Sequence, residues 1–229
     1  MKNLSMFLSS SIGKKIVMSV TGLFLCTFLA EHVAGNFLLF MNDNGAMYDA
    51  YTEFMSHNTV VRTIEIVLFV SLLGHAFSGV LVWIKNRRSR SENYKVYKLQ
   101  ENTPLASRIT MLTGSFIFLF LVVHLQTFFV PTRFGAESVS PYTLVVQAFS
   151  NRWYSAFYLI ALILLSYHLR HGFQSAFQTL GLRSKKYSNV LDWIAVVFWL
   201  LIPLGFASMP IYFAFFHRAG PSAMVIGVQ

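Results

Sequence analysis

The sequence predicts an all-α membrane protein with five transmembrane helices, four forming a bundle and the fifth packing beside them. Of its 229 residues, 55% are hydrophobic and only 12% are charged, whereas a soluble domain carries roughly 25% charged residues. Five long runs are almost free of charge, and a span needs about 20 apolar residues. Histidines also lie inside four of these runs, at matched positions. Lipid is therefore the expected solvent of most of the chain.

The five runs set the expected limits of the helices. The first is uncharged over 16–30 and again over 33–42, and the other four are uncharged throughout: 66–84, 109–132, 153–169 and 193–216. With flanking turns added, we expect helices at 14–41, 60–85, 106–130, 151–180 and 189–217, all in one domain over residues 1–229. The first run is too long for a secretory signal and lacks a small-residue cleavage site, so we expect it to act as a signal anchor.

The basic residues are distributed asymmetrically between the two sides of these helices. Thirteen of the 18 lie on one side: Lys2, Lys14, Lys15, Lys85, Arg87, Arg88, Arg90, Lys95, Lys98, Arg108, Arg183, Lys185 and Lys186. Four lie on the other: Arg62, Arg133, Arg152 and Arg218. The positive-inside rule makes the first side cytoplasmic, which predicts a cytoplasmic N-terminus. We expect the membrane to be a bacterial inner membrane, so that the C-terminus is periplasmic. The net charge of +9 then reflects topology and not nucleic-acid binding, although a peripheral protein could also dock on this basic face.

Cysteine usage limits the redox chemistry of the chain. Cys26 is the only cysteine, which excludes an internal disulfide, a cysteine-ligated iron–sulfur cluster and the C-x-x-C-H attachment of covalent haem. Any haem that this chain binds is therefore held without covalent attachment.

Four histidines inside the runs are related by an internal repeat: His32, His75, His124 and His168. His32 and His124 each follow a Thr-Gly pair, eleven residues after the Thr and ten after the Gly. His75 and His168 each precede a glycine by four residues. The Thr-Gly pairs are Thr21-Gly22 and Thr113-Gly114, and the glycines are Gly79 and Gly172. The offsets between copies are 92 and 93 positions. One helix pair therefore occurs twice, with two imidazoles in each copy.

Alternating topology converts these positions into heights within the membrane. His32 and His124 lie 17 and 16 residues beyond the last cytoplasmic-side charge, which is about 25 Å along a helix. His75 and His168 lie ten and twelve residues before the cytoplasmic ends of their helices, about 15 Å inside for His75. We therefore expect an outer pair, His32 with His124, and an inner pair, His75 with His168.

Paired imidazoles in a membrane bundle favour haem ligation. Ionisable groups in hydrocarbon are costly and usually functional, neutral imidazole is an axial ligand of haem iron, and bundles hold cofactors between facing helices. The sequence thus predicts two bis-histidine haems b, one held by each pair. Gly79 and Gly172, one turn beyond the inner pair, would leave room for a flat macrocycle, or would simply let helices pack closely.

Three further histidines are expected in other roles. His57 lies in the predicted outer loop and His217 at the outer end of the fifth helix, where both would be solvated interface residues. His171 shares a face with His168, but only His168 repeats the spacing of His75 to its glycine. We therefore expect His171 to hydrogen-bond near the inner haem without ligating it. Arg170 could pair with a haem propionate or extend to the interface.

These motifs resemble the cytochrome b subunit of the succinate dehydrogenase and fumarate reductase family, in the form with one five-helix anchor and two haems. The resemblance covers nearly the whole chain and rests on four stretches: Thr-Gly-Leu-Phe-Leu at 21–25 with His32, His-Ala-Phe at 75–77, Thr113-Gly114 with His124, and Tyr167-His168 through Gly172 to Thr179-Leu180-Gly181. It implies that the inner pair ligates a proximal haem and the outer pair a distal one.

The resemblance also implies partners and a substrate. The expected partners are a flavoprotein that carries FAD and interconverts succinate and fumarate, and an iron–sulfur subunit, both on the cytoplasmic face; the complex could also dimerise. The chain would be non-catalytic for succinate and fumarate and would exchange electrons with menaquinone. Some relatives carry a glutamate two residues before the ligand on the fourth helix, where this chain has Ser166. A proton pathway through that position is therefore not expected here.

Quinone chemistry couples electrons to protons, which draws attention to Glu31 and Glu65. They are the only carboxylates well inside the apolar runs, and intramembrane carboxylates are candidate functional groups. Glu31 adjoins His32, and Glu65 lies about 15 Å outward of His75. Both are candidate quinone or proton residues, although Glu65 could instead be a helix-end residue that reaches water beside Arg62.

Two alternatives remain at this point. The first is the di-haem cytochrome b of a nitrate reductase, hydrogenase or formate dehydrogenase, whose ligands have other spacings. The second is a transporter with a histidine proton relay, although transporters interrupt helices near their substrate site, and here Pro203 and Pro210 lie in the fifth helix, away from the four histidines.

Overall fold

The computed structural model describes Met6 and residues 10–88, 109–135 and 139–217. All regular structure in these residues is helical, and five helices are long and apolar enough to cross a membrane: 11–40, 59–88, 110–134, 152–179 and 188–215. The predicted fold class is confirmed, with helix limits that differ by a few residues. The predicted start of the third helix at 106 lies outside the described residues, as do Lys2, Arg90, Lys95, Lys98, Arg108 and Arg218.

Three of the five spans combine more than one kind of helix. The elements, in order of the spans, are α2 (Ser11–Asn36) with the 3-10 turn η1 (Phe37–Phe40); α4 (Thr59–Arg88); α7 (Thr110–His124) with the π-turn η2 (Leu125–Phe129) and α8 (Val130–Phe134); α10 (Arg152–Thr179); and α11 (Ser188–Val196) with the π-turn η3 (Val197–Leu201) and α12 (Ile202–Phe215). Isolated π-turns often occur at functional positions, and η2 begins directly after His124.

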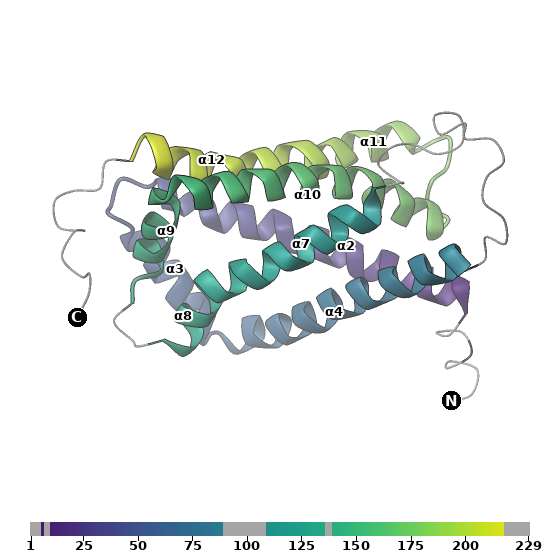
Figure 1. Cartoon of the computed structure of the whole chain (residues 1–229), viewed down its shortest axis with the longest axis horizontal. Coiled ribbons are helices and arrows are strands. Elements are labelled where there is room, and N and C mark those ends of the chain that lie inside the picture. The colour runs from purple at the N-terminus through teal and green to yellow at the C-terminus, as the bar shows by residue number, and fades with distance from the viewer. Residues whose placement is uncertain (1–5, 7–9, 89–108, 136–138, 218–229) are drawn as a thin grey trace.

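Two shorter helices were not predicted, α3 (Ala46–His57) and α9 (Pro141–Ser150). They lie together at the end of the molecule where the described chain finishes (Figure 1). Asp49 of α3 joins them, because its carboxylate accepts hydrogen bonds from the Ser140 hydroxyl at 2.6 Å and the Tyr142 amide at 2.8 Å. Ser140 is the N-cap of α9 and Tyr142 lies in its first turn, where an acceptor satisfies an amide that has no partner within the helix. His57 is the last residue of α3. The prediction that His57 lies in a loop was therefore wrong.

Helix α10 is the central helix of the bundle. It packs against α2, α7, α12 and α9, and its buried residues face several of these neighbours along its whole length: Ser155, Tyr158, Ala161, Leu162, Leu169, Phe173 and Ala176. Helix α4, by contrast, packs mainly on α2 and buries only Ser78. Most side chains of this span are therefore left uncovered by the rest of the described chain.

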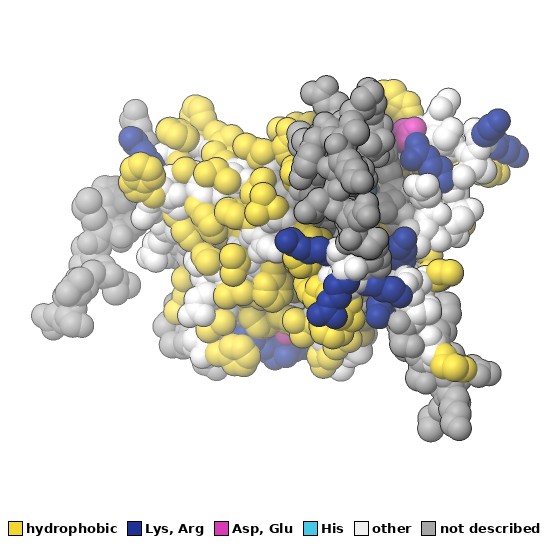
Figure 2. All heavy atoms as spheres, turned by 45° about the vertical axis from the view of Figure 1, so that its right-hand side comes forward, with side chains coloured by type: hydrophobic (Ala, Val, Ile, Leu, Met, Phe, Trp, Pro, Cys, Tyr) yellow, Lys and Arg dark blue, Asp and Glu magenta, His cyan; other side chains and the backbone are white. Residues whose placement is uncertain are grey.

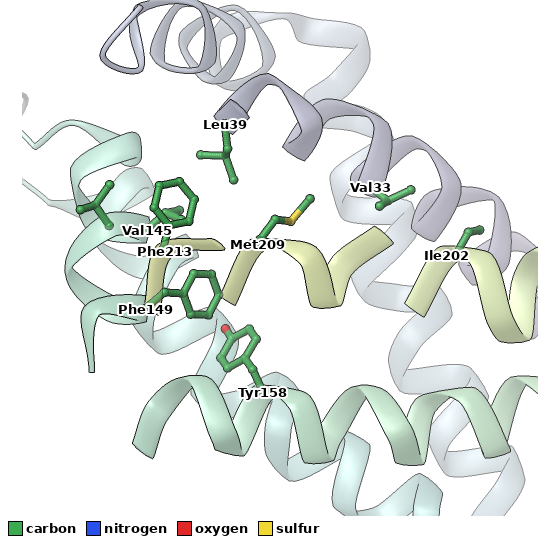
Figure 3. Close-up of a cluster of buried hydrophobic side chains, with 9 residues drawn as sticks. Val33, Leu39, Val145, Phe149, Tyr158, Ile202, Met209 and Phe213 are labelled. Atoms are coloured by element: carbon green, nitrogen blue, oxygen red, sulfur yellow. The ribbon is translucent and has the colours of Figure 1, made fainter. Parts of the chain in front are cut away.

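An apolar cluster fills the half of the bundle that lies next to α3 and α9. Figure 3 shows Phe149 from α9, Tyr158 from α10 and Phe213 from α12 close together, with Leu39 of the first span above them and Val33 further along the bundle toward Ile202. Tyr158 contributes a hydroxyl to this otherwise apolar environment, and its exposed fraction is 6%. A buried phenol normally has a hydrogen-bond partner, and this one bonds to a histidine of the outer pair.

The basic side chains gather at the opposite end from α3 and α9. Figure 2 shows Lys and Arg side chains on the end where α4 finishes and α11 begins. Lys85, Arg87 and Arg88 occupy the last turn of α4, while Arg183, Lys185 and Lys186 lie between α10 and α11. The charge asymmetry read from the sequence thus corresponds to two physical ends of the bundle (Figure 1).

Candidate functional site

The rings of the outer pair, His32 and His124, are neighbours within the bundle. The ring centroids of His32 in α2 and His124 in α7 are 5.9 Å apart, with the rings edge to face. Phe28 stacks on His32 at 5.2 Å, and Phe120 and Phe128 flank His124 at 5.9 and 5.4 Å. Two imidazoles from different helices therefore face each other within an aromatic enclosure.

The inner pair has the same arrangement one level down. The ring centroids of His75 in α4 and His168 in α10 are 6.2 Å apart, again edge to face. The Nδ1 atom of His75 lies 3.0 Å from the Met18 carbonyl oxygen. Because a carbonyl can only accept, Nδ1 of His75 carries the proton and Nε2 keeps its lone pair. A histidine in this tautomer is prepared to ligate a metal through Nε2.

The Thr-Gly pairs of the repeat are neighbours of the inner histidines. A Cβ atom on Gly22 would lie 2.9 Å from Cε1 of His75, and one on Gly114 would lie 3.4 Å from Cε1 of His168. Each half of the repeat thus places a glycine of one helix against the inner histidine of the next. Thr110 corresponds to Met18 in the repeat, and its backbone is the hydrogen-bonding neighbour of the buried His168.

The outer pair is held by side chains instead of backbone carbonyls. Nδ1 of His124 lies 2.9 Å from the Tyr158 hydroxyl, and the Tyr154 hydroxyl donates to that of Tyr158 at 3.3 Å. His32 is approached by the Asn36 amide nitrogen, 3.4 Å from Nε2. No sequence signal distinguished Tyr158 from the other tyrosines of the chain, because its role depends on a neighbouring helix.

This geometry fits haem with two axial histidines. With metal–imidazole bonds of about 2.0 Å, two rings on opposite sides of one metal have centroids roughly 6 Å apart, close to both observed separations. A Cβ atom on Gly172 would meet no atom within 4 Å, so space remains one turn beyond His168. In the outer pair, ligation through Nε2 of His32 would require the Asn36 amide to release that atom. Among the described residues no group of three potential ligands could hold a bare metal ion.

The two candidate quinone carboxylates have different partners. Glu31 accepts a hydrogen bond from the Tyr51 hydroxyl of α3 at 2.6 Å. Burial, followed by this hydrogen bond, raises the pKa of Tyr51 above its ordinary value, so the phenol remains a donor. Glu65 forms an ion pair with Arg62, and both side chains are partly exposed. The ion pair of Glu65 with Arg62 is compatible with the alternative that Glu65 is a helix-end residue. Glu31, in contrast, is hydrogen-bonded to helix α3.

The fourth span places Arg170 and Ser166 away from the inner pair. The Arg170 guanidinium lies over the indole of Trp199 at 5.3 Å, on a side of α10 about 160° from His168. The Ser166 hydroxyl donates to the Trp199 carbonyl in η3, which satisfies a backbone group within the π-turn. His171 is half-buried one turn beyond His168.

The remaining two histidines lie at the end of the bundle that carries α3 and α9. His57 is exposed and bonds within its own turn, to the Glu53 carbonyl at 2.9 Å. His217 is half-buried and contacts the rings of Phe213 at 5.1 Å and Tyr212 at 6.0 Å. The interface role of His57 thus stays a prediction for an exposed side chain, and His217 packs among aromatic rings.

Comparison with known families identifies the chain. The Succinate dehydrogenase/Fumarate reductase transmembrane subunit family matches residues 84–206, more than half of the sequence. The chain belongs to this family. No curated protein and no solved structure gives a significant match. The assignment makes the chain a transmembrane anchor subunit of a complex II-type assembly, in agreement with the resemblance read from the motifs. The matched region includes His124 and His168, whereas His32 and His75 lie before it.

Proposed function

We propose that this anchor subunit is a di-haem cytochrome b that carries electrons between an iron–sulfur subunit and menaquinone. The outer pair ligates the distal haem and the inner pair the proximal haem. FAD and the iron–sulfur clusters belong to partner subunits, which interconvert succinate and fumarate. The observation that carries this proposal is the pair of histidine couples at two levels of one bundle, each with ring centroids about 6 Å apart.

Each part of the site has a defined task in this account. Haem iron, when bound, exchanges one electron at a time between its ferric and ferrous states. The Met18 carbonyl keeps the proton of His75 on Nδ1 and leaves Nε2 free. The aromatic rings around the outer pair exclude water from it and hold the imidazoles in place. Glycines at the helix contacts let the imidazoles stand between closely packed backbones.

The proposed orientation places the basic end of the bundle in the cytoplasm. The iron–sulfur subunit docks on this end, so the inner pair lies nearer to it and the outer pair lies further across the membrane. We assign the assembly to a bacterial inner membrane, with the N-terminus cytoplasmic and the C-terminus periplasmic. A dimer of the complex is compatible with the exposed apolar surface of the spans.

Menaquinone is proposed to react near the outer pair. Conversion of a quinone to its quinol takes up two electrons and two protons, so a site near Glu31 or Glu65 would combine electron delivery with a carboxylate. The reverse reaction releases the same electrons and protons. Ser166 provides no carboxylate at the position where some relatives carry one, and its hydroxyl is engaged by Trp199. We therefore propose no proton transfer through that position.

The family assignment weighs against the two alternative functions. Cytochromes b of nitrate reductases, hydrogenases and formate dehydrogenases would not be expected to match a complex II anchor family. A histidine proton relay in a transporter would require rings that exchange protons along a path, whereas here they are grouped as two separate couples.

Purification of the native membrane complex tests the proposal. The account predicts co-purification of a flavoprotein and an iron–sulfur protein, succinate- or fumarate-linked turnover with menaquinone analogues, and a reduced-minus-oxidised spectrum of low-spin haem b. A complex that lacks a haem b spectrum would refute the redox role, and partners of another enzyme class would refute the assembly.

A further inference from the structure

Tyr158 is the side chain that contacts the ring nitrogen of an outer histidine from a neighbouring span. Its hydroxyl lies 2.9 Å from Nδ1 of His124, and its exposed fraction is 6%. The two residues lie on different spans, α10 and α7. Tyr158 therefore joins the central helix of the bundle to one ring of the outer pair.

The phenol ring is held in a fixed position. Phe120 and Phe149 pack edge-on against it, with ring centroids 4.8 and 4.9 Å away, and Figure 3 shows Tyr158 directed toward Phe149 within the apolar cluster. The Tyr154 hydroxyl, one turn earlier on α10, reaches the Tyr158 oxygen at 3.3 Å. A hydroxyl fixed in this way aims at one atom of His124.

We propose that Tyr158 is the positioning residue of the distal haem ligand: its hydroxyl oxygen accepts a hydrogen bond from the Nδ1–H of His124, so that Nε2 faces the iron. This inference rests on the proposed function, because it assumes that His124 ligates haem. A metal-ligating histidine commonly donates its second N–H to a neighbouring acceptor, which fixes the tautomer and ring orientation and raises the basicity of the ligand. Tyr158 supplies that acceptor for His124.

The two haem levels would then be controlled by different kinds of acceptor. The inner ligand His75 is bonded to a backbone carbonyl, which no substitution of Met18 removes. The outer ligand His124 is bonded to a phenol, which can both donate and accept. Ligation of iron by Nε2 removes the ambiguity, because the only proton left on the ring is then on Nδ1. The electronic character of the outer ligand can therefore be changed by one side chain.

Tyr158→Phe tests this inference in the purified complex. The variant keeps the ring and removes the acceptor, so His124 becomes a less basic ligand and its ferric iron is less stabilised. The midpoint potential of the outer haem should rise and its low-spin electron paramagnetic resonance signal should shift, while the inner haem keeps both values. Tyr167→Phe, on the exposed side of the same helix, is the matched control and should change neither haem.

If Tyr158→Phe loses the outer haem, a second and milder substitution still tests the inference. Site-specific 3-fluorotyrosine in place of Tyr158 keeps the hydroxyl but weakens it as an acceptor, and should shift the outer potential in the same direction by a smaller amount. The inference is overturned if the outer signals stay at their wild-type values in both variants, or if Tyr167→Phe shifts them equally. The haem content of the wild-type complex distinguishes failure of this inference from failure of the proposed function. The proposed function fails if the wild-type complex does not contain two haems per chain.

Discussion

Gly22→Ala provides a sharp test of how the helices hold the inner pair. Alanine in a helix interior is normally favoured over glycine by about 1 kcal/mol. Here the new methyl would lie 2.9 Å from Cε1 and 3.2 Å from Nδ1 of His75, whereas carbon atoms pack best at about 3.5–4.0 Å. The ring must retreat by roughly 0.6 Å or more to restore that spacing.

That movement is cheap for a free imidazole and costly for a ligated one. His75 is fixed on one side by the Met18 carbonyl and, in the proposed holoprotein, by iron on the other. Overpacking of a fixed site costs about 1–3 kcal/mol, which corresponds to roughly 5- to 150-fold weaker retention of the inner haem. The expected product of Gly22→Ala is a complex that keeps the outer haem and loses or loosens the inner one.

Gly114→Ala is the matched control for this prediction. The equivalent methyl would lie 3.4 Å from Cε1 and 3.7 Å from Nδ1 of His168, close to ordinary packing distance. Haem content per chain and the separate low-spin resonance signals of the two haems provide the assay. Equal haem content and an unchanged inner signal in both variants would refute the reasoning, because the shorter contact would then have no consequence.

Four further expectations concern haem content and turnover. Alanine in place of either outer-pair histidine should remove the outer haem from the spectrum of the purified variant. Alanine in place of either inner-pair histidine should remove the inner haem. Survival of both haems in any of these four variants would exclude the substituted residue as a ligand. His171→Ala should retain both haems. Gly172→Leu should lower inner haem content, although a Cβ there meets no protein atom within 4 Å; unchanged content would mean that no macrocycle fills this space. Glu31→Gln or Glu65→Gln should depress menaquinone-linked turnover and spare succinate oxidation by an artificial dye. Full menaquinone-linked activity in both variants would place the quinone elsewhere.

We propose an open groove near Tyr154 as the next candidate site for a quinone head group. This groove of about 360 Å³ is lined by Thr127, Leu144, Gln147, Ala148, Asn151 and Tyr154. Its polar members come from η2, from α9 and from the start of α10. If the carboxylate variants retain full activity, Gln147→Leu is the next substitution to assay, with the same dye control for assembly.

The spans and the heights of the histidines could be predicted from sequence because both depend on local chain geometry. Uninterrupted apolar runs specify helices long enough to cross a membrane. A rise of about 1.5 Å per residue then converts counts from a charged end into depth. This reasoning paired His32 with His124 and His75 with His168, and the structure places the rings of each couple side by side.

Features that depend on contacts between elements were not predicted. Helix α9 begins at a local Ser140-Pro141 start, where the Ser140 hydroxyl accepts from the Thr143 amide, but its docking on α3 through Asp49 joins residues far apart in the sequence. Helix α3 has no long apolar run to reveal it. In the sequence the Thr-Gly pairs are related by spacing to His32 and His124. In space, however, the glycines of these pairs are neighbours of His75 and His168. Only the packing of α2 on α4 and of α7 on α10 identifies those neighbours.

Haem stoichiometry tests the central claim most directly. Pyridine haemochrome analysis of the purified complex, normalised to this chain, should give two haems b, and a redox titration should resolve two low-spin components. The four imidazoles form two couples at different levels, and we propose that each couple ligates one iron. A result of one haem b per chain, or none, would contradict the account.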